Sequence, residues 1–269
     1  MNASHTRLFV CLLLALVTLD FGCVHSPDQK IGYGGKSWSL TEIFPAGPNR
    51  DLAAAAAVGD LSGIDHALSS GADVNFRGAN DLTPLWWAAW DQNLAGFTHL
   101  LERGADPNVL PSKNSPVMHT VAEMLWPSGF LKAALKHGGN PELRDNEGRR
   151  VIYAAIAQGT REHLDVLLAA GANVNRQPDE VNSAPIFLAA LARHYDWVLL
   201  FLERGADPAV KNRGGQDLAF FIGTFPYDPN SEHYVWRERV IRFLRSKGIE
   251  AHPPPNEGKR TKPLPADLV

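Results

Sequence analysis

Gly71-Ala72-Asp73-Val74-Asn75 is one of five related pentapeptides in this 269-residue chain. The phrase returns with small changes, so that its copies lie at 71–75, 104–108, 138–142, 171–175 and 205–209. The leading glycines are spaced 33, 34, 33 and 34 residues apart. A period this regular indicates one supersecondary unit copied along a solenoid. The sequence therefore predicts a row of stacked units rather than a single closed core.

The segment 82–114 shows how one unit is built. Thr83-Pro84 is expected to open a first helix, because threonine caps free amides and proline fits the first turn. Asn93 is expected to cap a second helix, and the later residues Phe97, Leu100 and Leu101 supply its apolar stripe. The unit is therefore two antiparallel helices.

The repeated phrase itself closes each unit. Gly104 is expected to end the second helix in the left-handed conformation that glycine tolerates best. Asp106 and Asn108 favour a turn by bonding to their own backbone. A hairpin-like loop therefore leads from one helix pair to the next.

This arrangement, opened by Thr-Pro-Leu and closed by Gly-Ala-Asp-x-Asn, strongly resembles the ankyrin repeat. The resemblance implies an all-α ankyrin-repeat solenoid over residues 50–252, with five repeats and an irregular C-terminal capping unit. The repeats are placed at 50–81, 82–114, 115–148, 149–182 and 183–216, and the capping unit at 217–252.

Two units depart from the family pattern. The third begins with Ser115-Pro116-Val117 and has Pro127 and Gly129 where its second helix should start, so we expect any soft joint there. The capping unit has an insertion at 225–234. Its second helix, expected at 234–247, has one charged side that includes Arg237, as the polar outer face of a terminal cap requires.

The first 22 residues are predicted to be a signal peptide. The apolar run Leu8 to Leu19 is too short to span a bilayer and suits the core of a secretory signal. Gly22-Cys23 after this run resembles the lipobox of bacterial lipoproteins, which implies lipidation of Cys23. Ordinary secretion remains the alternative, since Asp20 stands where the family favours leucine. The resemblance implies a location in the bacterial periplasm. Val24, which follows the cysteine where an acidic residue could stand, implies a lipid anchor in the outer membrane.

Residues 23–49 are rich in glycine and proline and are predicted to be a lipidated or flexible tether. The proline-rich segment 253–269 is predicted to be a disordered tail. The only cysteines are Cys11 and Cys23, so the mature chain is expected to fold without an internal disulfide.

Composition and motifs exclude several function classes. A formal net charge of −3 provides no electrostatic attraction to nucleic acid. The chain contains no Gly-x-Ser-x-Gly or His-Glu-x-x-His motif, and no two histidines have metal-ligand spacing on a helix. The carboxylates Asp179-Glu180 fall in a predicted loop. We therefore expect no catalytic residues, no metal site and no cofactor.

Ankyrin proteins usually bind a partner through the loop tips and the exposed side of each first helix. Alignment to the second repeat transfers this surface to other repeats, and the sites that we single out as partner-binding are Trp87, Trp90, Asp91, His119, Glu123 and Tyr153. Further positions expected on the same surface are Ala122, Ile156, Ala157, Leu188, Leu191 and Ala192. Aromatic anchors beside polar groups are typical of binding hot spots.

The tryptophans of the second repeat have two interpretations. Trp86 is expected in the core. Trp87 and Trp90 either fill the space between the first two repeats or lie exposed on the binding surface, and the sequence favours neither.

The resemblance implies protein binding, and three functions compete. The first is an immunity protein that binds and neutralises a secreted toxic enzyme, because the layout is similar to ankyrin-type lipoprotein immunity proteins of secreted antibacterial phospholipases. The second is a periplasmic adaptor or chaperone that supports an envelope enzyme. The third is an enzyme or metal-binding protein, which the motif survey disfavours.

Overall fold

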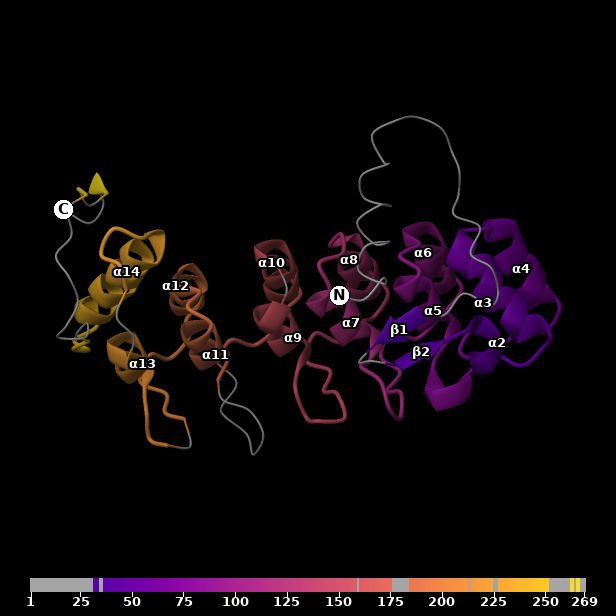
Figure 1. Ribbon diagram of the computed structural model, residues 1–269, viewed down its shortest axis with the longest axis horizontal. Coiled ribbons are helices and arrows are strands. Elements are labelled where there is room, and N and C mark those ends of the chain that lie inside the picture. The colour runs from indigo at the N-terminus through magenta and orange to yellow at the C-terminus, as the bar shows by residue number, and fades with distance from the viewer. Residues whose placement is uncertain are drawn as a thin grey trace, which may run out of the picture.

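In the computed structural model the chain is a row of helix pairs that runs from α3 at one end to α14 at the other (Figure 1). The structure describes residues 31–33, 36–158, 160–175, 184–212, 214–224, 227–251, 262–263 and 265–266. The loops between successive pairs project on the side of the first helix of each pair (Figure 1). We call the surface made by these first helices and loops the inner face.

Each predicted unit contains one helix pair. The first helices are α3 (Pro48–Val58), α5 (Pro84–Trp90), α7 (Val117–Glu123), α9 (Val151–Gln158), α11 (Pro185–Leu191) and α13 (Leu218–Thr224). The second helices are α4 (Leu61–Ser69), α6 (Leu94–Glu102), α8 (Gly129–Lys136), α10 (Arg161–Ala169), α12 (Tyr195–Glu203) and α14 (Glu232–Ser246). The predicted all-α solenoid is thereby confirmed.

The predicted caps are present in the second pair. The Thr83 hydroxyl accepts a hydrogen bond from the Trp86 amide at 3.2 Å. The Asn93 side chain accepts one from the Gly96 amide at 2.9 Å. Gly104 has a φ of 91°, which glycine adopts without the steric cost of a Cβ atom. Local sequence therefore sets the ends of these helices.

The aspartate and the asparagine of the repeated phrase do different work. Asp106 closes a turn as predicted, because its carboxylate accepts from the Asn108 amide at 2.8 Å. The Asn108 side chain instead reaches the next repeat, where it accepts from the Asn140 amide at 2.7 Å and donates to the Gly138 carbonyl at 2.9 Å. The prediction that Asn108 bonds its own backbone was therefore wrong.

Asn75 and Asn175 make the same two bonds to the repeats that follow them. Glu142 takes this place in the third repeat and makes one of the two, accepting from the Asn173 amide at 2.9 Å. A carboxylate has no hydrogen to donate, so it cannot make the second bond. The repeated pentapeptide therefore forms a turn within its own repeat and also forms hydrogen bonds to the next repeat.

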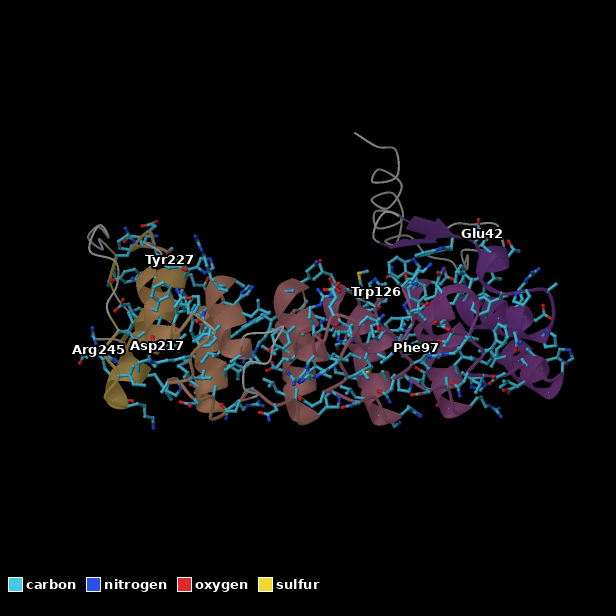
Figure 2. The ribbon with its side chains drawn as sticks, turned by 90° about the horizontal axis from the view of Figure 1, so that it is seen from below. Glu42, Phe97, Trp126, Asp217, Tyr227 and Arg245 are labelled. Carbon is cyan, nitrogen blue, oxygen red and sulfur yellow. The ribbon has the colours of Figure 1, made fainter. Side chains whose placement is uncertain are left out.

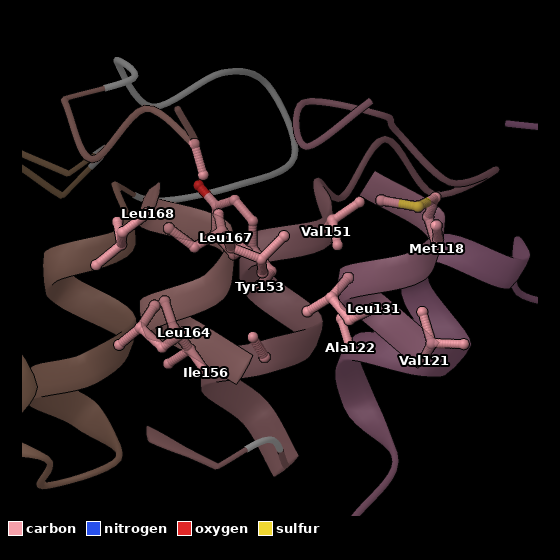
Figure 3. Close-up of a cluster of buried hydrophobic side chains, with 14 of the residues drawn as sticks. Met118, Val121, Ala122, Leu131, Val151, Tyr153, Ile156, Leu164, Leu167 and Leu168 are labelled. Carbon is pink, nitrogen blue, oxygen red and sulfur yellow. The ribbon is translucent and has the colours of Figure 1, made fainter. Parts of the chain in front are cut away.

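The core is a continuous apolar layer between neighbouring pairs. Figure 3 shows one section of it, with Met118, Val121 and Ala122 on α7 and with Val151 and Ile156 on α9. All five side chains are at most 1% exposed. Small residues in the first helices let the pairs approach closely, so apolar packing holds the stack together with the hydrogen bonds between repeats.

The folded body begins earlier than predicted. β1 (Ile31–Tyr33) and β2 (Lys36–Trp38) form an antiparallel ribbon, and α2 (Leu40–Ile43) follows it. Ser39 and Glu42 form a reciprocal capping box at the start of α2. Leu40, Ile43 and Phe44 are buried against the first pair. The described part of segment 23–49 is therefore an N-terminal cap, and the tether prediction was wrong there.

The irregular third repeat is filled by an aromatic side chain. α7 ends at Glu123, and the segment before α8 carries Trp126, which lies among the second and third pairs in Figure 2. The Trp126 ring is 5.8 Å from that of Trp90 and 5.9 Å from that of Phe130. Trp126 thus provides aromatic contacts to both the second and the third repeat at the place where the sequence predicted a soft joint.

The capping unit corrects one further expectation. α14 spans Glu232–Ser246, two residues earlier at its start than predicted. Arg237 is fully buried rather than part of the charged face, with its guanidinium 5.1 Å from the Tyr227 ring and 5.0 Å from the Tyr234 ring. Tyr227 comes from the insertion, so the inserted segment folds over the arginine and encloses it between aromatic faces.

The predicted signal peptide, Cys23 and most of the proline-rich tail lie outside the described residues. Within the described residues, no helix combines the length and the apolar character needed to cross a bilayer.

Candidate functional site

A hollow of about 240 Å³ opens on the inner face around α7, α9 and α11. We call it the hollow, and its lining residues are Ser115, His119, Glu123, Asp145, Arg149, Tyr153, Ala154, Ala157 and Leu188. The structure therefore brings together three of the predicted partner-binding residues, from two different repeats.

His119 forms the most buried polar part of this lining. It is 2% exposed, and its Nε2 lies 2.8 Å from the Arg149 carbonyl oxygen. A carbonyl only accepts, so Nε2 carries the hydrogen. Burial lowers the pKa of His119, against the opposite influence of that carbonyl. The ring is thus neutral near pH 7, and its Nδ1 is an unprotonated acceptor.

Asp145 and Arg149 form the loop side of the hollow. The Asp145 carboxylate accepts from the Arg149 amide at 2.8 Å and from its Nε at 2.9 Å. The Arg149 guanidinium also lies 3.3 Å from the Glu147 carboxylate. Two carboxylates therefore hold the guanidinium in place and neutralise it.

The helix side of the hollow is mixed in character. Glu123 lies at the end of α7 and accepts from the Gln158 side chain at 3.2 Å. Tyr153 is only 7% exposed, while Ala154, Ala157 and Leu188 supply apolar wall. Polar groups on one side and apolar groups on the other suit a bound side chain that has both a polar and an apolar part.

Trp87 does not belong to this surface. Its side chain is 3% exposed and packs edge-on against Phe44, with ring centroids 6.1 Å apart. The N-terminal cap therefore covers the position, and the interpretation of Trp87 as an exposed anchor was wrong. The signal was present in the sequence, because Leu40, Ile43 and Phe44 have helical spacing after a Ser-x-x-Glu capping box.

Trp90 is half-buried and packs within the protein. It stacks on Trp86, with centroids 5.3 Å apart and planes at 2°, while Trp126 meets it edge-on. Trp86 is 4% exposed, in agreement with its expected core position. Asp91 is half-buried directly after α5. Neither Trp90 nor Asp91 lines the hollow, and their roles in binding stay predictions.

Of the other positions expected on the inner face, some are buried and some are exposed. Ala122 and Ile156 were expected on the surface but lie in the core, at 0% and 1% exposed. Leu191 is 49% exposed, as expected, and Phe220 on the next first helix is 48% exposed. Which positions reach the surface depends on the neighbouring side chains that cover them, and a residue alignment does not record these contacts.

Sequence reasoning missed Asp145 and Arg149. They come from a loop, whereas the alignment transferred helix positions only. The tight turn at Asp145 to Gly148, where Gly148 has a φ of 77°, was the available signal. In the described part of the chain, no group of three or more His, Cys, Asp or Glu side chains is placed to hold a metal ion.

Comparison with known proteins agrees with this architecture. The family model for ankyrin repeats in three copies matches residues 118–212, and that for a single ankyrin repeat matches residues 80–110. The ankyrin repeat domain of Bcl-3 superimposes with a TM-score of 0.61, at 20% sequence identity, over 74% of this chain and 86% of that one. At that identity the likeness concerns the fold alone.

Among curated proteins, Protein PhlB of Serratia liquefaciens is 32% identical over 194 residues, which cover 71% of this chain and 81% of PhlB. The E3 ubiquitin-protein ligase KEG of Arabidopsis thaliana is 27% identical over 160 residues, but this chain spans only 9% of its length. The palmitoyltransferase akr1 of Neurospora crassa is 24% identical over 117 residues, with 16% of its length spanned. From its repeats, its fold and its likeness to PhlB, this chain belongs to the ankyrin-repeat family.

Proposed function

We propose that this protein is an immunity protein, which binds a secreted toxic enzyme such as a phospholipase and neutralises it. Ankyrin repeats indicate a protein-binding scaffold. The observation that carries the proposal is the apolar floor of the inner face. Three successive first helices, α9, α11 and α13, contain no charged residue. An uncharged floor bordered by polar loops has the anatomy of a protein interface.

This surface is suited to blocking rather than to catalysis. Leu188 and Leu191 lie one turn apart on α11, and Phe220 lies on the next first helix. Large apolar side chains at the centre of an interface provide most of the binding free energy once water is excluded. A partner held along this row would have the contacted part of its surface covered.

We further propose that the protein acts in the bacterial periplasm, held at the outer membrane by a lipid on Cys23. The support is the apolar run before Cys23 in the sequence. Mass spectrometry of the mature amino terminus from the native envelope tests this. A diacylglyceryl adduct on Cys23 is the expected result, and an unmodified terminus elsewhere would contradict it.

The test of function is a protection assay. Cells that express the full chain are exposed to any secreted effector that a neighbouring gene encodes, and survival and capture of that effector are measured. Survival without the chain, or death despite it, contradicts immunity. Capture without protection would favour the adaptor function instead.

Variants of the inner face sharpen the assay. Leu191→Asp and Phe220→Asp are expected to abolish capture, because each places a carboxylate on the apolar floor. Leu61→Asp is the matched control, since Leu61 is 41% exposed but begins α4, a second helix. Equal loss of capture in all three variants would point to a general effect and not to the inner face.

A further inference from the structure

We infer that the hollow receives one arginine or lysine side chain from the partner protein, and that apolar residues beside that cation lie on the row formed by Leu188, Leu191 and Phe220. This inference rests on the proposed function as a protein-binding scaffold, and it names the chemistry of the segment that is bound. Its support comes from the size, the charge and the surroundings of the hollow.

The size of the hollow is sufficient for a single side chain. Its volume is about 240 Å³, whereas small-molecule and cofactor sites usually enclose roughly 300–1,000 Å³. The hollow is also open on the inner face rather than enclosed within one repeat, since its lining comes from three successive repeats. An extended side chain presented by another protein matches both features.

The charges of the lining favour a cation. Glu123 and Asp145 contribute two carboxylates against the single guanidinium of Arg149. That guanidinium already lies against Asp145 and Glu147, at 2.9 Å and 3.3 Å. The lining therefore carries net negative charge, which repels a phosphate or a carboxylate and attracts an incoming cation.

His119 adds an acceptor to the same lining. Its Nε2 hydrogen is committed to the Arg149 carbonyl, which leaves a lone pair on Nδ1. Nδ1 is buried and has no hydrogen-bond partner among the described residues. Buried acceptors without a donor are costly, and a neutral ring adds no positive charge that would repel an incoming cation.

The apolar side of the hollow favours apolar partner residues next to the cation. Ala154, Ala157 and Leu188 line one side of the hollow. Leu191 continues this side along α11, and Phe220 follows on α13. The stem of an arginine or lysine side chain packs well on such surface, and neighbouring apolar residues of the partner extend the contact.

The experiment uses capped tripeptides and the full chain in solution. Arg-Leu-Leu is compared with citrulline-Leu-Leu, because citrulline keeps the shape of arginine but has no charge. Binding is followed by NMR through the backbone amides of His119, Glu123 and Tyr153. We expect these amides to shift with the arginine peptide, and the citrulline peptide to bind about tenfold more weakly.

Two variants test whether the hollow causes the preference for the arginine peptide. Glu123→Gln is expected to remove the preference for arginine over citrulline, while Glu203→Gln, on the exposed side of α12, is expected to leave it intact. Equal binding of the two peptides, shifts confined to residues outside the hollow, or no binding of either peptide would each overturn the inference. None of these outcomes depends on the protection assay, so the two proposals fail separately.

Discussion

The side chain of Asn108 accepts a hydrogen bond from the backbone amide of Asn140 at 2.7 Å, across the boundary between the second and third repeats. The same side chain donates to the Gly138 carbonyl at 2.9 Å. One amide group thus satisfies a donor and an acceptor of the next repeat. Because each repeat contacts mainly its neighbours, such bonds decide how cooperatively the stack unfolds.

Asn108→Ala removes both bonds and is expected to lower the free energy of unfolding by about 1–2 kcal/mol. Asn108→Asp keeps the acceptor and loses the donor, so it is expected to fall between the alanine variant and the native chain. Urea denaturation followed by circular dichroism measures both. Glu203→Ala serves as a surface control, expected within about 0.5 kcal/mol of the native chain. Identical stabilities for all three variants would show that the bond contributes nothing.

Trp87→Ala is expected to destabilise the protein by about 3–5 kcal/mol, because it leaves a cavity beneath the N-terminal cap. Trp87→Phe keeps an aromatic partner for Phe44 and is expected to cost less. Thermal unfolding of the purified variants provides the comparison. A Trp87→Ala chain of native stability that fails to capture its partner would instead support an exposed binding role for this residue.

Glu142 and Arg150 both differ from the family pattern, and their side chains form an ion pair. Arg150 stands where other repeats have Pro84, Pro116 or Pro185, and it is 2% exposed. Its Nε lies 3.4 Å from the Glu142 carboxylate. A buried cation requires a nearby anion, and the Glu142 carboxylate provides one for Arg150.

Glu142→Gln and Arg150→Met are each expected to cost about 1–3 kcal/mol of unfolding free energy, and the double variant less than their sum. The glutamine retains an acceptor for the Asn173 amide, so it isolates the loss of charge. The stabilities of the native chain, the two single variants and the double variant form a double-mutant cycle. Strict additivity would mean that the two residues do not interact.

Stability is expected to fall as the pH drops below about 6.5, the ordinary pKa of histidine in an unfolded chain. Burial lowers the pKa of both His119 and His163 in the folded state. The unfolded chain therefore takes up more protons than the folded chain in this range, and protonation favours unfolding. The stabilising contribution is complete above the unfolded pKa and is lost as the pH falls through the folded pKa.

His119→Gln keeps a donor for the Arg149 carbonyl but cannot titrate. The decrease in urea midpoint between about pH 7.5 and about pH 5.5 is expected to be smaller in this variant than in the native chain. His163 accounts for a remaining decrease. An unchanged pH dependence would show that His119 does not contribute to it.

The repeat period and its turn residues could be interpreted from sequence because their information is local. Thr83 caps an amide three residues away, and Gly104 adopts its conformation with no help from distant residues. The candidate site was harder to predict. His119, Glu123 and Tyr153 were found by alignment, but the loop residues Asp145 and Arg149 were not, since the transferred pattern contained helix positions only.

The amino-acid sequence by itself determined the number of helix pairs, their order and the helix ends of the second repeat, because capping, helical periodicity and glycine conformation act within a few residues of each other. Only the tertiary structure decided which aromatic residues are exposed. Trp87 is covered by Phe44, which lies 43 positions earlier, and Trp90 is packed against Trp126 of the next repeat. Burial depends on what the rest of the chain places above a residue, and a single repeat does not contain that information.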